Sequence, residues 1–222
     1  MSQKALEYPL LILDTSSRRT WVGLKLAADQ LLARSEEQDP SKTLFRLLEE
    51  LLDQTEVSLS ELKSIAFCAG PGSMLGARTT SMAIRAWKGI GIPAAENVYF
   101  YNSLQIGALL AAKSEQNGLV VTDARRSSWN ALPFPYDSAE SLRLIENQEL
   151  ENLQQPLVSF AEFPAWTKTE AAITLLTYDP SPIFEKEDFL QLLSLTENAT
   201  PLTIRHNEFK KWEAKIHSAP HQ

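Results

Sequence analysis

One stretch of the sequence, residues 64–88, restricts the fold more than any other. An apolar run at 64–68 leads directly into Ala69-Gly70-Pro71-Gly72-Ser73, and a helix-like pattern follows from about residue 73 to residue 88. Glycines at such a junction allow a sharp turn and a close approach between a helix and the strand before it. A strand that passes through a tight turn into a helix is typical of proteins that mix helices with a central sheet. We therefore expect an α/β fold.

The residues before this stretch support the same fold class. Short apolar runs at 10–13, 21–26 and 31–34 predict three strands in succession. Asp39-Pro40 is a typical helix start, and leucines recur at three- and four-residue spacing from residue 44 to residue 52, which predicts a helix over 39–54. Ser58 and Glu61 form a capping box. After residue 88 we expect a strand at 97–101, a helix at 103–113 and a strand at 118–122.

The pattern is weaker in the second half. We expect strands at 128–135, 141–145 and 171–177, a helix at 185–195 and a terminal helix at 209–216. No repeat of fixed period is evident. We divide the chain into an N-terminal lobe, residues 1–100, and a C-terminal lobe, residues 101–222, and leave open whether the last helix returns to the first lobe.

Composition excludes several classes of protein. The 21 Lys+Arg against 28 Asp+Glu give a net charge of −7, which argues against a protein that grips nucleic acid through an overall basic field. The single cysteine, Cys68, excludes an intrachain disulfide and a four-cysteine zinc site. No run reaches the roughly 18 apolar residues of a membrane-spanning helix. We expect a cytoplasmic protein that does not enter a membrane.

Two aspartates follow apolar strands and are candidates for phosphate or metal binding. Asp14 opens the turn Asp14-Thr15-Ser16-Ser17, which could face a metal-bound phosphate or simply close a hairpin. No glycine lies between Asp14 and Trp21 to let backbone approach a phosphate. Asp123 is best interpreted as a turn cap. The block at 70–78 is not a P-loop, because no lysine follows Gly76. We therefore assign no catalytic, cofactor-binding or metal-binding residue.

Two predicted helices offer more apolar surface than one sheet contact requires. We interpret part of this surface as a partner interface, with intramolecular core packing as the alternative. The residues assigned to the interface are Leu44, Leu47, Leu48, Leu51, Met74, Ala77, Arg78, Ser81, Met82 and Arg85. The residues assigned to a structural loop are Gly70, Pro71, Gly72, Ser73 and Gly76.

Taken together, these features resemble the TsaB family, also called YeaZ. The matching segments are Ile12-Leu13-Asp14-Thr15-Ser16, Ser58-Leu59-Ser60-Glu61-Leu62, Ile65-Ala66-Phe67, Gly70-Pro71-Gly72-Ser73 with Gly76 and Arg78, Gly89-Ile90-Gly91-Ile92-Pro93, Ser103-Leu104 and residues 121–125. A weaker match is Pro201-Leu202-Thr203-Ile204-Arg205. The resemblance covers residues 10–125 well and residues 126–200 poorly.

The resemblance implies an actin-like, Hsp70-like ATPase fold (ribonuclease H-like) with two lobes and mixed central sheets. It also implies a non-catalytic subunit that binds the catalytic protein TsaD through helices of the N-terminal lobe, with the ATPase TsaE as a third component. The complex forms N6-threonylcarbamoyladenosine at position 37 of tRNAs, and tRNA is expected to meet this chain only through the complex. The same helices could also form a homodimer.

The sequence departs from the family pattern on this expected contact surface. Pro40-Ser41-Lys42 stands where the family has His-Ser-Glu, and Ser73-Met74-Leu75-Gly76-Ala77-Arg78 stands where it has Ser-Phe-Thr-Gly-Val-Arg. Thr79-Thr80 replaces Ile-Gly. Two other functions remain as alternatives: a small kinase or ATPase that uses Asp14 and Asp123 around magnesium, and a self-associating interaction module.

Overall fold

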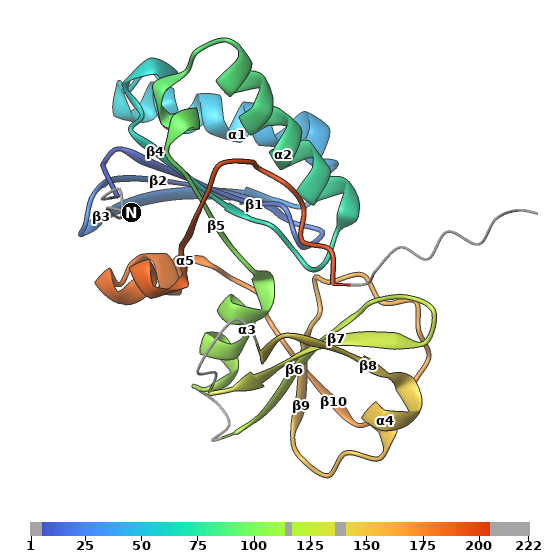
Figure 1. Cartoon of the computed structure of the whole chain (residues 1–222). Coiled ribbons are helices and arrows are strands. Elements are labelled where there is room, and N and C mark those ends of the chain that lie inside the picture. Colours follow the sequence, from blue (N-terminus) through green and yellow to red (C-terminus); the bar gives the residue numbers. More distant parts are fainter. Residues whose placement is uncertain (1–5, 114–116, 136–140, 205–222) are drawn as a thin grey trace, which may run out of the picture.

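The computed structural model describes residues 6–113, 117–135 and 141–204 of the chain. It consists of two lobes, each built on one sheet, with helices α1 and α2 covering the outer face of the first sheet (Figure 1). Among the described residues, no helix is both long enough and apolar enough to cross a membrane.

The first sheet has the strand order β11-β5-β4-β1-β2-β3. Strands β1 (Leu10–Asp14), β2 (Thr20–Ala27) and β3 (Gln30–Glu36) form an antiparallel meander. Strands β4 (Ser64–Cys68) and β5 (Val98–Tyr101) continue the sheet parallel to β1. The edge strand β11 (Ser194–Thr196) pairs antiparallel with β5, so the chain returns to the first lobe near its end.

Both faces of β1 are covered, and its side chains alternate between two cores. Leu11 and Leu13 pack into the core beneath α1 (Pro40–Thr55) and α2 (Met74–Gly89). Leu10 and Ile12 pack into a second core that both lobes share. Burial on both faces explains why the strand is a continuous apolar run rather than an alternating one. The connections in this lobe include short 3-10 turns η1 (Leu59–Glu61) and η2 (Pro93–Glu96).

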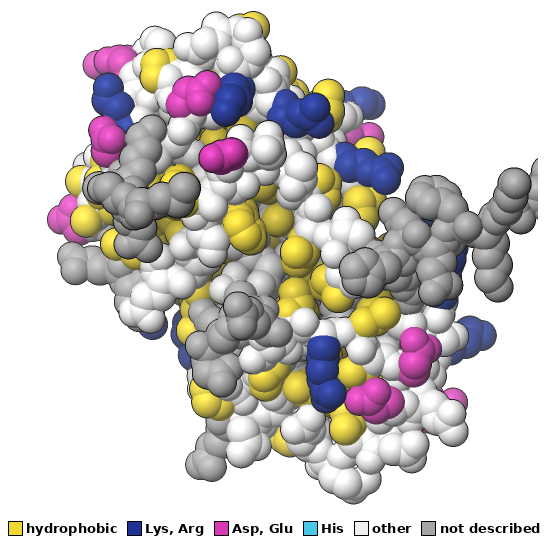
Figure 2. All heavy atoms as spheres, in the orientation of Figure 1, with side chains coloured by type: hydrophobic (Ala, Val, Ile, Leu, Met, Phe, Trp, Pro, Cys, Tyr) yellow, Lys and Arg dark blue, Asp and Glu magenta, His cyan; other side chains and the backbone are white. Residues whose placement is uncertain are grey.

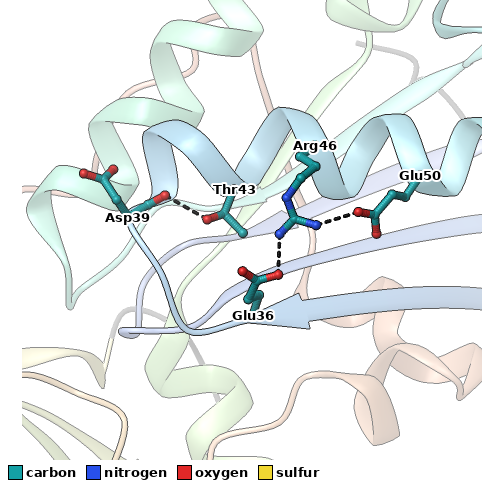
Figure 3. A network of polar contacts seen from close by, with 5 residues as sticks. All are labelled: Glu36, Asp39, Thr43, Arg46 and Glu50. Atoms are coloured by element: carbon teal, nitrogen blue, oxygen red, sulfur yellow. Dashed lines mark hydrogen bonds and ion pairs between the residues drawn. The ribbon is translucent and has the colours of Figure 1, made fainter.

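The start of α1 follows the capping pattern seen in the sequence. Asp39 accepts a hydrogen bond from the Ser41 backbone N–H at 2.8 Å, and Pro40 occupies the first helical position. An exposed polar network lies beside it (Figure 3). There Arg46 contacts Glu36 at the end of β3 and Glu50 one turn further along α1. Exposed ion pairs of this kind contribute little to stability, so the buried leucines hold the helix in place.

The second sheet repeats the order of the first. Its strands are β6 (Gly118–Asp123), β7 (Ser128–Phe134), β8 (Arg143–Glu146), β9 (Leu157–Phe160) and β10 (Ile173–Leu176). Their order, β10-β9-β6-β7-β8, matches β5-β4-β1-β2-β3, with the same parallel and antiparallel pairings. This duplicated arrangement is that of the actin-like ATPase fold and confirms the expected fold class.

Three further helices complete the described structure. Helix α3 (Ser103–Ala111) connects the lobes and packs against the second sheet. Helices α4 (Asn147–Glu151) and α5 (Ser181–Phe184) are short. The expected helix at 185–195 is wrong: a 3-10 segment η4 (Glu187–Leu192) is followed by β11, because extended residues there satisfy the open edge of β5. Strand β9 was not predicted, and the helix expected at 209–216 lies outside the described residues.

Candidate functional site

Asp14 ends β1 and is completely enclosed, with 1% of its surface exposed. Its Oδ1 accepts hydrogen bonds from the backbone N–H of Ser16 at 3.0 Å and from the Ser16 hydroxyl at 2.6 Å. Its Oδ2 accepts hydrogen bonds from the hydroxyls of Tyr101 at 3.0 Å and Tyr178 at 2.8 Å. Tyr101 ends β5 of the first lobe, whereas Tyr178 follows β10 of the second. The carboxyl group therefore connects the two lobes.

Burial controls the ionisation of this cluster. Desolvation raises the pKa of Asp14, against the opposing effect of its four hydrogen bonds. Desolvation, reinforced by the charge of Asp14, raises the pKa values of Tyr101, Tyr178 and Cys68 well above their usual ranges. Cys68 is therefore a buried core thiol that stays protonated at neutral pH.

The turn after Asp14 is covered by the loop and helix that follow β4. A Cβ atom at Gly72 would lie 2.1 Å from the Ser16 carbonyl oxygen, and one at Gly76 would lie 1.9 Å from the Thr15 carbonyl oxygen. The Ser73 backbone N–H donates to the Ser16 carbonyl at 2.6 Å. Gly72 and Gly76 thus permit the loop and the start of α2 to pack closely on the backbone of the turn after Asp14.

Asp123 ends β6, the strand of the second lobe that corresponds to β1. Its Oδ1 accepts from the Arg125 backbone N–H at 2.5 Å and from the Thr167 hydroxyl at 3.0 Å. Its Oδ2 accepts from the backbone N–H groups of Trp166 and Thr167, both at 2.5 Å. Partial burial raises the pKa of Asp123, but the backbone hydrogen bonds outweigh it and hold the pKa below its usual value.

These two environments do not fit a magnesium–triphosphate group. Magnesium–nucleotide sites use one or two carboxylates together with water and the substrate phosphates, and each of these carboxyl groups already accepts four hydrogen bonds from the chain. Within the described ranges, no three His, Cys, Asp or Glu side chains gather in a way that could hold a metal ion. A cavity of about 260 Å³ remains near Asp123, between Gly72 and Leu202.

A different surface is open on the first lobe, in the groove between α1 and α2. This helix groove has a volume of about 460 Å³ and is lined by Ser41, Phe45, Arg78, Thr79, Met82, Ala83 and Ala86. Phe45 is 47% exposed and Met82 is 60% exposed. The Phe45 ring is fixed edge-on against Trp87 with 6.2 Å between ring centroids. The groove is therefore a preformed apolar surface.

The exposed residues of α2 have a spacing suited to a second helix. Leu75, Thr79, Met82 and Ala86, of which Thr79 is half-buried, follow one another at intervals of four, three and four residues, and such a stripe forms the seam between two packed helices. Arg78, Arg85 and Lys88 are exposed on the same helix. Figure 2 shows Lys and Arg side chains spread across the part of the upper lobe where α2 lies in Figure 1.

The structure separates the predicted interface residues into two groups. Met74, Arg78, Met82 and Arg85 are exposed. The other six are buried in the chain, so their side chains are not available at its surface: Leu44, Leu47, Leu48, Leu51, Ala77 and Ser81. The leucine stripe of α1 faces the sheet, because this helix packs on β2 and β3. The leucines thus fill the first lobe's core.

The predicted interface did not include the apolar residues Phe45, Leu75 and Ala86 or the polar residues Ser41 and Thr79. Phe45 carried a usable signal, because it stands beside the leucine stripe and cannot face the sheet together with it. Leu75 is 59% exposed at the start of α2, two residues after the Ser73 cap.

No family model and no curated protein matches the sequence of this chain. Its structure is similar to that of an uncharacterized protein from Pseudomonas aeruginosa with similarity to peptidase YeaZ, at a TM-score of 0.60 and 21% identity over 88% of this chain and 99% of that one. It is also similar to YeaZ from Pseudomonas aeruginosa, at a TM-score of 0.57 and 22% identity over 87% of this chain and 98% of that one. The chain therefore has the fold of YeaZ.

Proposed function

We propose that this chain is a non-catalytic partner subunit that binds TsaD through the helix groove and supports formation of N6-threonylcarbamoyladenosine at position 37 of tRNAs. The observation that carries the proposal is the apolar groove between α1 and α2, with Phe45 and Met82 about half exposed. Isolated apolar residues are common on surfaces, but a contiguous apolar groove marks an interaction site.

The charges around the groove favour one kind of partner. Two exposed cations of α2, Arg78 and Arg85, lie along one side of the stripe that contains Met82, and Arg78 also lines the groove. A partner helix with an apolar stripe and acidic residues beside it would be complementary in shape and in charge. We therefore expect the TsaD of the same organism to contain such a helix, and its sequence can be searched for the pattern.

The environments of Asp14 and Asp123 support a non-catalytic role. Each carboxyl group accepts four hydrogen bonds from the chain itself, and the turn after Asp14 lies beneath Gly72 and Gly76. The alternative of a small ATPase requires these groups to bind magnesium. Calorimetric titration with Mg-ATP tests it, and we expect no binding tighter than about 100 μM, or about −5.5 kcal/mol.

The direct test is co-purification with the TsaD of the same organism, comparing Met82→Asp with Leu175→Asp. Both side chains are exposed, 60% and 63%, but Leu175 lies on β10 of the other lobe. Placing a charge at a central contact of an interface costs about 2 kcal/mol or more, so Met82→Asp should weaken the complex about 30-fold. Leu175→Asp should leave it unchanged.

A homodimer through the helix groove would use the same surface as TsaD. Light scattering of the chain with and without TsaD distinguishes the homodimer from the complex by mass. A dimer that converts to a complex with TsaD agrees with the proposal. A chain that forms no complex with TsaD, or equal effects of the two aspartate variants, would contradict it.

A further inference from the structure

The second lobe carries an exposed basic surface that the proposed function does not use. It lies where the β6–β7 turn meets the loop between β9 and β10. An open hollow of about 520 Å³ there is lined by Arg125, Arg126, Ser127, Trp166, Thr167 and Lys168. We call the four side chains Arg125, Arg126, Trp166 and Lys168 the basic patch. Three cations lie together here on a chain whose net charge is −7.

An aromatic ring lies at the centre of the basic patch. Trp166 is 54% exposed, although indole rings are usually buried. The guanidinium carbon of Arg125 lies 4.1 Å from the centre of the Trp166 ring, in cation–π contact. The pair thus presents a flat, charged and partly apolar platform to solvent.

The turn that presents the arginines has an unusual backbone. Three successive residues, Arg125, Arg126 and Ser127, have positive φ angles of 62°, 52° and 57°. Non-glycine residues in this region cost about 1–3 kcal/mol each and persist only where the surroundings hold them. Three backbone hydrogen bonds hold this turn: from Ala124 N–H to the Ser128 carbonyl at 2.9 Å, from Ser128 N–H to the Arg125 carbonyl at 3.1 Å and from Asn147 N–H to the Ser127 carbonyl at 2.8 Å.

Asp123 joins the two halves of the basic patch. Its carboxyl group accepts from the Arg125 backbone N–H on one loop and from the Trp166 and Thr167 backbone N–H groups on the other. It thereby fixes the arginine turn beside the indole ring. Two other acidic side chains of this lobe are also engaged in hydrogen bonds within the chain. Glu146 accepts from the Ser128 hydroxyl, and Glu151 accepts from the backbone N–H of Glu170.

We propose that the basic patch binds unpaired nucleotides of a nucleic acid. Cations in a hollow attract phosphates, whereas an exposed aromatic ring stacks with a base, and this combination is the chemistry of single-strand recognition. Trp166 with Arg125 provides the stacking surface for a base, and Arg126 and Lys168 contact the adjoining phosphates. The proposal goes beyond the partner role, because it concerns the other lobe and does not require the helix groove to be occupied.

The test measures binding of fluorescently labelled oligonucleotides of about 12 nucleotides to the full chain by fluorescence anisotropy. Single-stranded RNA, single-stranded DNA and duplex RNA are compared, with polyglutamate as a competitor. Stacking on one base is worth about 5-fold or more in affinity, so Trp166→Ala should lose at least that and Trp166→Phe should recover most of it.

A double variant, Arg126→Ala with Lys168→Ala, tests the phosphate contacts. It should lower affinity and flatten the dependence of log K on log salt by about 1.4, since each phosphate contact on a single strand contributes about 0.7. The matched control, Arg34→Ala with Lys63→Ala, removes two exposed cations from the first lobe and should leave both quantities unchanged.

Tighter binding of either single strand than of the duplex supports the proposal, and the tighter of the two strands identifies the source of the nucleotides. Absence of binding at protein concentrations up to about 100 μM in low salt would overturn it. Equal binding of duplex RNA, full competition by polyglutamate or an unchanged affinity of Trp166→Ala would also overturn it, because each would leave only unspecific charge attraction.

Discussion

Replacing Tyr178 with phenylalanine should measure how strongly the Asp14 cluster connects the two lobes. The change removes the hydroxyl that donates to Asp14 at 2.8 Å and keeps the ring, which packs edge-on against Phe160 and Phe163 with 5.3 and 4.9 Å between centroids. Asp14 Oδ2 retains the hydrogen bond from Tyr101. The expected loss is about 1.5 kcal/mol, where the ranges for neutral and charged acceptors meet.

The assay is urea unfolding at neutral pH of the single variants Tyr178→Phe and Tyr101→Phe and of the double variant. If the slope of the free energy of unfolding against urea concentration is the same in all variants, only their stability has changed. The two hydroxyls share one acceptor oxygen, so each single loss is partly compensated by the remaining donor. The double variant should exceed the sum of the single losses by about 0.5 kcal/mol or more. Both single variants within about 0.5 kcal/mol of the wild type would refute this reasoning.

Two further predictions concern the same region. Burial raises the pKa of Asp14 in the folded state, so ionisation of Asp14 lowers the stability of the wild type as pH rises through that pKa. Asp14→Asn cannot ionise, and its free energy of unfolding should therefore improve relative to the wild type as the pH rises above the ordinary aspartate pKa of about 4. A difference that stays constant with pH would contradict this. Gly76→Ala would place a Cβ 1.9 Å from the Thr15 carbonyl oxygen and should lower the free energy of unfolding by about 1–3 kcal/mol or more, measured by thermal or urea unfolding. The control Gly89→Ala, whose Cβ would have no atom within 4 Å, should leave the stability unchanged. Equal effects of the two variants would refute the packing role of Gly76.

Local sequence patterns predicted the helices and strands of the first lobe because each of these elements is specified by residues close to it in the sequence. The leucine spacing of α1, the Asp39-Pro40 start and the apolar run of β1 each depend on neighbours within a few residues. The same patterns could not show which apolar face of α2 remains open, because Ala77 and Ser81 are small residues whose burial depends on distant contacts. They are buried, while Met82 on the same helix is exposed.

The Asp14 cluster lay beyond local inference for a related reason. Its two tyrosines are 87 and 164 residues away along the chain, and nothing near either one indicates a shared acceptor. The duplicated strand order was also hidden. In the first lobe the meander is followed by the long helix α1, whereas α4 at the corresponding place spans only Asn147–Glu151. The two halves therefore share topology without sharing a sequence period.

The duplicated strand order places the two aspartates at corresponding positions of the two lobes. Asp14 and Asp123 end corresponding strands, β1 and β6, yet burial raises the pKa of the first and hydrogen bonds lower the pKa of the second. Each carboxyl group nevertheless accepts four hydrogen bonds from its own chain. At Asp14, Ser16 supplies two of them and tyrosine hydroxyls supply the other two, of which Tyr178 belongs to the second lobe. At Asp123, backbone N–H groups of two loops supply three and the Thr167 hydroxyl supplies the fourth. The aspartate at this position of the fold therefore has a structural role in both lobes, with a different set of hydrogen-bond donors in each. In the second lobe, Asp123 holds the two loops of the basic patch together.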